Sequence, residues 1–185
     1  MDGIKLMVEE HKYIKRMLLV IRKASYGIVK GENINFDDFF AIIDFVRNYA
    51  DNHHHGKEEK LLFTKMVDEI GDVAEVLVKY GMHVEHDLGR LFMRDLEEAL
   101  IKVKNGDDEA KIDVISNAVS YTHLLTRHIN KEDNTVYTFA QRKLSKETLN
   151  TINIQCEAFE KEEEEKQVQH NYIMLLESLE KKYLG

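Results

Sequence analysis

Two histidine–glutamate pairs with a four-residue spacing are the residues in this sequence best suited to do chemistry. His54 precedes Glu58, and His128 precedes Glu132. In an α-helix, residues four apart lie on one face, about one turn from each other. An imidazole and a carboxylate in that arrangement are suitable ligands for iron, zinc or manganese. The spacing therefore predicts that each pair contributes to a metal site.

The first of these pairs has an alternative in the neighbouring register, namely His55 with Glu59. Ala50 belongs to the apolar stripe of the same helix, and His54 follows it by four residues, so these two share a face. At about 100° per residue, His55 and Glu59 lie further round the helix. We expect His54 and Glu58 to point inward, and His55 and Glu59 to point outward.

Histidines elsewhere in the chain supply further candidate ligands. His11 falls within the apolar stripe of a helix expected over 4–26, and His86 lies on a helix expected over 72–104. For His83, three residues before His86, two roles remain open: a metal ligand, or a histidine behind the ligands or at the surface. We expect His53 to be a surface residue or to lie behind the ligands.

Long helices are needed to position these side chains, and the composition favours them. The 185-residue chain has no proline and is rich in Leu, Ile, Glu and Lys. We predict an all-α, up-down-up-down four-helix bundle over 1–142, and an additional C-terminal helix over 143–185 packed on it. The expected helices span 4–26, 36–70, 72–104, 107–142 and 146–184. The acidic run 160–165 is expected to be a solvated helix face.

The expected helix lengths place the candidate ligands at one level of the bundle. His11 lies about 15 residues before the end of its helix, and His54 about 18 residues after the start of the next. At ~1.5 Å per residue, their depths differ by only ~4–5 Å. His86 and His128 also lie at similar distances from the connected ends of their helices. Each of the four helices is therefore expected to bring a histidine to a layer in the middle of the bundle.

The energetic cost of such a layer favours a metal centre. Burying an imidazole or a carboxylate without a partner costs several kcal/mol. Two carboxylates from opposing helices, with histidines around them, form a site for two metal ions. The carboxylates can bridge the ions, and an open position can accept a small ligand.

The composition also limits the class of partner and the compartment. A net charge of −8 makes nucleic acid and anionic membrane surfaces unfavourable partners. The single cysteine, Cys156, excludes an internal disulfide and suits a reducing environment. No stretch has the pattern of a signal peptide or of a membrane span. We therefore expect a cytoplasmic protein that binds neither nucleic acid nor membranes.

Taken together, these motifs resemble the hemerythrin-like family, also called the HHE cation-binding domain. The resemblance covers about residues 4–142 and extends loosely over the last helix. It is carried by His11 and by three segments: His54-His55-Gly56-Lys57-Glu58-Glu59 with Leu62-Phe63, Glu85-His86-Asp87-Leu88-Gly89-Arg90, and His128-Ile129-Asn130-Lys131-Glu132-Asp133.

The resemblance implies a non-haem di-iron centre with an oxo or hydroxo bridge. It implies that the two glutamates bridge the irons and that each helix supplies one terminal histidine. Dioxygen, nitric oxide and peroxide are the small ligands that it implies. Manganese uses similar ligands, so the residues alone leave the metal open. The implied ligands are His11, His54, Glu58, His86, His128 and Glu132.

The sequence departs from the family pattern in three places. Oxygen-carrying members have a fifth histidine one turn before the ligand of the third helix, where this chain has Met82. His83 stands one residue later. Thr64 takes the place of the usual proline after the second-helix motif, and His53 the place of a frequent cysteine. The first departure puts reversible oxygen carriage in doubt.

Three functions are compatible with this pattern. The first is binding of dioxygen, nitric oxide or peroxide in an oxygen, oxidative or nitrosative stress response. The second is an oxidoreductase that reduces dioxygen or peroxide with an external electron donor. The third is iron storage or donation, including repair of iron-sulfur clusters. A centre with only four certain histidines fits turnover as well as binding, so whether the protein is an enzyme remains open.

Overall fold

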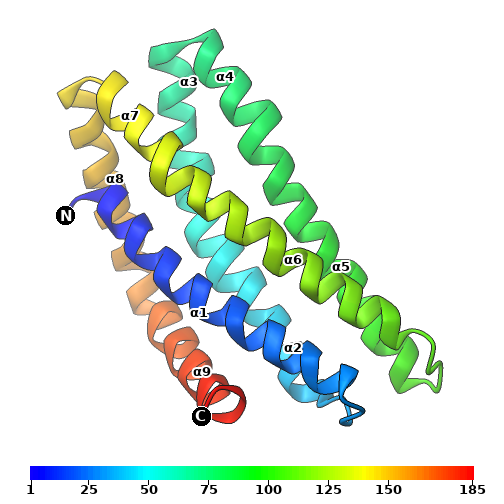
Figure 1. Ribbon diagram of the computed structural model, residues 1–185. Helices are drawn as coiled ribbons and strands as arrows, with labels where there is room; N and C mark the ends of the chain where they lie inside the picture. The colour runs from blue at the N-terminus through cyan, green and yellow to red at the C-terminus, as the bar shows by residue number, and fades with distance from the viewer.

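Four long antiparallel helices form the body of the molecule, and a shorter helical pair covers one side of it (Figure 1). The computed structural model describes residues 1–185. The long helices are α1 (Gly3–Val29); α2 (Phe36–Phe45) continued by η1 (Val46–His55), η2 (Glu58–Phe63) and α3 (Thr64–Ile70); α4 (Asp72–Leu77) continued by η3 (Val78–Met82) and α5 (His83–Lys104); and α6 (Lys111–Lys131) continued by η4 (Glu132–Val136) and α7 (Tyr137–Lys143). The pair is α8 (Lys146–Glu165) and α9 (Val168–Tyr183).

The helix ends are fixed by local chemistry. The Asn35 side chain accepts a hydrogen bond from the Asp38 backbone N–H at the start of α2, as the sequence predicts. Gly71 has φ +77° between α3 and α4, a conformation that a side chain would strain. The second and third long helices can therefore turn back on each other without an intervening loop.

The prediction of an all-α, up-down-up-down bundle is confirmed, with two differences in detail. The fourth long helix begins at Lys111, not at residue 107. The C-terminal region is two helices rather than one, because Gln167 adopts a left-handed conformation with φ 56° and interrupts the helix. Both α8 and α9 pack along α1 (Figure 1). The division of the chain into domains at residue 142 stays a prediction.

Wider turns occur in three of the four long helices where the histidines and glutamates lie. The segments η1, η2, η3 and η4 are π-helical, with hydrogen bonds from residue i to residue i+5. Such a turn rotates each residue by less than the 100° of an α-helix. The faces of these segments therefore differ from those that an α-helical projection predicts.

Two apolar clusters fill the bundle above and below this level. The larger joins the second half of α1 to α2, α5 and α6, and includes Ile21, Phe45 and Leu96. The smaller joins the start of α1 to α3, α7 and α8, and includes Met7 and Phe63. The polar side chains between them are held in a layer closed off at both ends by packed hydrocarbon. None of the helices is both long and apolar enough to cross a lipid bilayer.

Candidate metal centre

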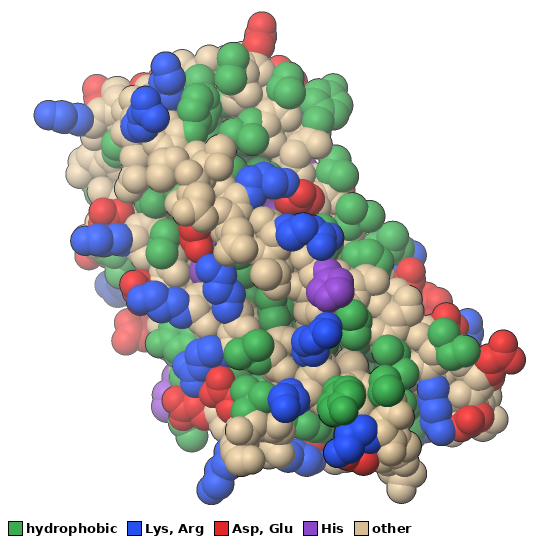
Figure 2. Space-filling model, in the orientation of Figure 1, with side chains coloured by type: hydrophobic (Ala, Val, Ile, Leu, Met, Phe, Trp, Pro, Cys, Tyr) green, Lys and Arg blue, Asp and Glu red, His purple; other side chains and the backbone are tan.

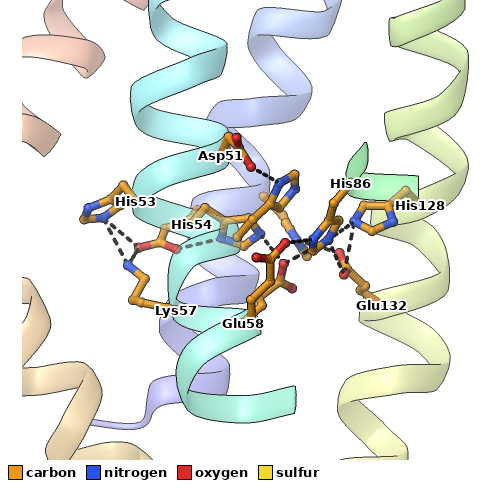
Figure 3. A network of polar contacts seen from close by, with 12 residues as sticks. Asp51, His53, His54, Lys57, Glu58, His86, His128 and Glu132 are labelled. Carbon is orange, nitrogen blue, oxygen red and sulfur yellow. Dashed lines mark hydrogen bonds and ion pairs between the residues drawn. The ribbon is translucent and has the colours of Figure 1, made fainter. Parts of the chain in front are cut away.

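All six side chains that the sequence singles out as ligands meet in the layer between the two apolar clusters. Figure 3 labels all of them except His11. Each has an exposed fraction of 1% or less. In agreement with this burial, few histidines appear on the face of the molecule drawn in Figure 2, among scattered acidic and basic side chains. The six are His11, His54, Glu58, His86, His128 and Glu132.

These side chains form two adjoining sets of donor atoms. One set contains His11, His54, Glu58 and Glu132; the other contains His55, Glu58, His86 and His128. Within each set the donor atoms lie within 4.8 Å of one another, and Glu58 belongs to both. The Nε2 of His128 lies 3.1 Å from a Glu132 oxygen, and the Nε2 of His11 lies 3.3 Å from the other. Ligands bonded at about 2.0–2.2 Å to one ion have separations of roughly this size.

His55 is a member of the second set, and its predicted outward orientation is wrong. Its ring is buried and stacks on the ring of His86, with the centroids 3.8 Å apart. The cause is the π-helical conformation of η1, which rotates consecutive residues by less than an α-helix does. As a result His54 and His55 both reach the layer and face different sets.

The five histidines of the layer share one hydrogen-bond pattern, in which the Nδ1 atom of each contacts a carboxylate. An ionised carboxylate only accepts hydrogen bonds, so each Nδ1 carries a proton, and Nε2 is the nitrogen through which the neutral ring can bind a cation. This arrangement is typical of metal-binding histidines, whose rings are held by such partners. The pairs are His11 with Asp133 at 2.7 Å, His54 with Glu10 at 2.8 Å, His55 with Asp51 at 3.2 Å, His86 with Glu59 at 2.7 Å and His128 with Glu85 at 2.9 Å.

Several atoms on the inner side of the layer have no protein hydrogen-bond partner. These are the Nε2 atoms of His11 and His54, Oε2 of Glu58 and both carboxylate oxygens of Glu132. The Nε2 atoms of His86 and His128 face each other at 3.1 Å, where two lone pairs repel unless a proton or a cation lies between them. Unpartnered buried acceptors are costly. A divalent cation in each set removes that cost, so the residues present fit a metal centre.

The pKa values of the two glutamates, Glu58 and Glu132, are shifted in opposite directions. Burial and the nearby Glu132 charge raise the pKa of Glu58 well above its ordinary value. Burial acts on Glu132 in the same direction, but His128 and His11 outweigh it and hold the pKa of Glu132 well below its ordinary value. A proton on this pair is therefore favoured on Glu58 rather than on Glu132, and a bound cation can take its place.

Neighbouring groups also shift the pKa values of two histidines, His54 and His128, in opposite directions. Burial and the adjacent His11 lower the pKa of His54 to about 4. Burial alone would also lower the pKa of His128, but Glu132 and Glu85 raise it to about 9. At neutral pH His54 is therefore ready to bind a cation, whereas His128 must first lose a proton.

Tyr137 is a residue of the site that the sequence gave no reason to select. It is wholly buried, donates a hydrogen bond to Oε1 of Glu58 and stacks on the His11 ring at 5.6 Å. It follows Glu132 by five residues, the repeat of the π-helical segment η4. Nothing in the sequence marks that turn. Tyr137 therefore occupies Oε1 of Glu58, whereas Oε2 has no protein hydrogen-bond partner and can bind a cation.

The remaining candidates lie around the layer. His83 is half-exposed and its Nδ1 is 3.7 Å from a Glu59 oxygen, outside both sets. His53 is buried behind His54, one of the two positions expected for it. Glu85 contacts His128, and Arg90 contacts Asp51, Glu59 and Asp87. Glu10 and Asp133, which hold two of the histidines, were not selected from the sequence.

The arrangement suits cations that prefer nitrogen and oxygen ligands. Imidazoles with carboxylates that can bridge favour iron, manganese or zinc over softer ions, and no thiolate is present. Glutamates and histidines that project from four helices into a bundle core also form the di-metal centres of other helical bundles.

Comparison with known proteins agrees with this chemistry. The sequence profile of the family described as "Hemerythrin HHE cation binding domain" matches residues 2–140. No curated protein shows significant similarity to the chain. The matched region contains both sets of donor atoms and covers most of the chain. The protein therefore belongs to the hemerythrin HHE cation-binding domain family.

Proposed function

We propose that the protein holds two iron ions in the buried layer and binds dioxygen or a related small ligand, nitric oxide or peroxide, there. One observation carries the proposal. Five histidines direct their Nε2 atoms at two buried glutamates, one of which belongs to both sets, while a second ring of carboxylates holds every Nδ1. The proposed ligands are those implied by the sequence, with His55 added. Iron at these residues supplies reversible binding of, or electron transfer to, small oxidising molecules.

The two sets differ in the number of protein ligands they offer. His55, His86 and His128 serve one ion, whereas only His11 and His54 serve the other, and Glu58 is shared by both sets. The ion with two histidines has more room for a ligand from solution. The ligand count therefore favours an open position on the side of His11 and His54, whereas the cavity next to the layer borders the other set.

A cavity of about 150 Å³ next to the layer sets an upper limit on ligand size. It lies between η1 and α5, and its lining includes His55, His86, Gly89, Tyr121 and Asp51. The Tyr121 hydroxyl is buried without a partner. A space of this size admits a diatomic molecule, peroxide or a few waters, and it excludes larger organic substrates. This supports a role in responses to oxygen or to oxidative or nitrosative stress.

An anaerobic loading experiment tests the proposal. The metal-free protein is incubated with ferrous iron, excess metal is removed, and iron per chain is measured. Air is then admitted and removed while the visible absorption is recorded. We expect about two irons per chain and an absorption band that appears with air and disappears without it. A Glu58→Gln variant treated identically serves as the metal-deficient control.

Each other outcome points to a different conclusion. A rapid, irreversible spectral change rejects reversible binding and favours reduction of dioxygen or peroxide. Irons that pass readily to a mild chelator favour storage or donation. Fewer than about two irons per chain contradict the proposed centre itself.

A further inference from the structure

A buried lysine connects the metal layer to the C-terminal helices. Lys57 is wholly buried beside Glu58. Its ammonium group donates to Oε1 of Glu10 on α1 and to Oε1 of Glu160 on α8. It also lies 3.0 Å from Nε2 of His53, and Figure 3 shows these two side chains next to each other. An ammonium has three donors, and these three acceptors satisfy them. Lys57 is therefore fixed by partners from three separate helical segments.

The same contacts lead directly to a proposed metal ligand. Glu10 uses one oxygen for Lys57 and the other, Oε2, for Nδ1 of His54 at 2.8 Å. Burial alone would raise the pKa of Glu10, but His53, His54 and Lys57 hold it well below its ordinary value. An unbroken series of charge-assisted contacts thus runs from Glu160 through Lys57 and Glu10 to His54.

The far end of this series lies outside the part of the chain that defines the family. Glu160 belongs to α8, whereas the family match ends at residue 140. It was expected on a solvated helix face, but its side chain is only 14% exposed. Most of its neighbours in the acidic run, including Glu164, are exposed as expected. Glu160 is therefore the member of the run that faces the bundle.

Helix α8 is held firmly enough to position a side chain. The Gly3 backbone N–H donates to Oδ1 of Asn153 at 2.8 Å. A Cβ on Gly3 would lie only 2.8 Å from Sγ of Cys156, so the absence of a side chain allows this close approach. Ile152 and Cys156 are both fully buried against the bundle. The location of Glu160 relative to Lys57 is thus set by packing rather than by the ion pair alone.

A third metal site at the same place is disfavoured. Glu10, His53 and Glu160 have the donor types and the spacing for a cation. However, the Lys57 ammonium already bonds to all three and supplies the positive charge. The lysine takes the role that a metal ion has in the neighbouring layer, and it leaves Glu10 free to hold His54.

We propose that Glu160 is a positioning residue of the metal centre, and that the C-terminal helices therefore determine how firmly the ion on the His11–His54 side is held. This rests on the proposed function, in which His54 is a ligand. Without the Glu160 carboxylate, Lys57 has Glu10 as its sole anionic partner and draws it away from Nδ1 of His54. The His54 ring then loses part of the contact that orients it and increases its basicity.

The test compares Glu160→Gln with Glu164→Gln, which removes the same charge from an exposed position of the same helix. Full-length proteins are loaded with ⁵⁷Fe(II) without oxygen, and iron release to a coloured chelator is followed. In Glu160→Gln we expect one of the two irons to leave about three to ten times faster than in the wild type. Removing a residue that directly contacts a metal ligand typically changes metal affinity by about 10- to 100-fold, and Glu160 acts less directly. The other iron and both irons of Glu164→Gln keep the wild-type rate. Mössbauer spectra should show one of the two iron signals shifted.

Three results overturn the inference. Identical release and spectra in the two variants mean that Glu160 does not act on the centre. Faster loss of both irons, with a lower thermal midpoint of the metal-free variant, means that Glu160 only packs α8. Wild-type protein that does not retain two irons contradicts the proposed function, and the inference with it; this result is distinct because it precedes any comparison of variants.

Discussion

Two series of polar contacts leave the metal layer, one behind His54 and one behind His86, and they differ in their exposure to water. Behind His54 are Glu10 and Lys57, both at most 1% exposed. Behind His86 are Glu59 and Arg90, whose side chains are 23% and 39% exposed. Both series orient an imidazole by a carboxylate on Nδ1, but one is dry and the other reaches the surface.

The difference shows two ways of fixing the same kind of ligand. In the buried series, breaking an ion pair leaves a charge without water, so each member depends strongly on the next. In the exposed series, water and salt replace a lost partner at a cost of about 0–1 kcal/mol. We expect the His54 side to be rigid and insensitive to salt, and the His86 side to be tolerant of substitution.

The largest effect on iron binding is expected at Glu58, because this glutamate belongs to both sets of donor atoms. Glu58→Gln removes a charged ligand from each and should abolish binding of both irons, as measured by elemental analysis of the purified protein. The metal-free variant should be no less stable than the metal-free wild type, because Gln has the shape of the neutral carboxyl group that burial and Glu132 favour at this position. A variant that retains two irons contradicts the assignment of Glu58.

The next largest effect separates the two sets. His55→Phe keeps an aromatic ring on His86 but removes the Nε2 donor, so the protein should bind about one iron instead of two. His83→Ala is the matched control, since that half-exposed histidine lies outside both sets. Loss of an iron in the control, with two retained in His55→Phe, would reverse the assignment of the fifth histidine.

A third effect depends on pH through His128. Its pKa is raised to about 9, so its contribution to the stability of the metal-free fold is complete below pH 6.5 and is lost as the pH rises through about 9. Metal binding needs the neutral ring and must displace this proton. Iron affinity should therefore rise by up to about tenfold per pH unit between pH 7 and 9.

The measurement for this pH effect is anaerobic thermal unfolding with and without ferrous iron. The increase in midpoint caused by iron should grow from pH 7 to pH 9. Glu85→Gln removes one of the carboxylates that raise the pKa of His128 and should make the pH dependence weaker. A pH-independent increase in wild-type protein would show that His128 is already neutral at pH 7.

The smallest effect is expected on the exposed series. Arg90→Met removes the contacts to Asp51 and Glu59, and should weaken iron retention by no more than about two- to threefold at low salt. In ~0.5 M salt the difference from wild type should vanish, because these charges are screened. Iron-release rates at both salt concentrations provide the measurement. An effect that persists at high salt would mean that the two series are equally dependent on their charges.

The residues that could be predicted from the sequence are those whose spacing matches a regular α-helix. His54 and Glu58, like His128 and Glu132, interrupt apolar stripes at α-helical intervals, and the absence of proline indicates long helices. The comparison of depths along antiparallel helices placed His11 in the same layer. The bundle, its helix order and six members of the layer therefore followed from local pattern and elementary geometry.

The residues that could not be predicted depend on two features of the tertiary structure. His55 and Tyr137 reach the layer because η1 and η4 are π-helical, a wider turn that packing of the whole bundle imposes and that no residue type announces. Glu160 faces inward because α8 packs against α1 at Gly3, far away in the sequence. By itself the sequence determined the fold and the chemistry of the centre, because both arise from periodicity and residue type. The tertiary structure alone decided the fifth histidine and the buried support of His54, because both depend on the placement of distant segments.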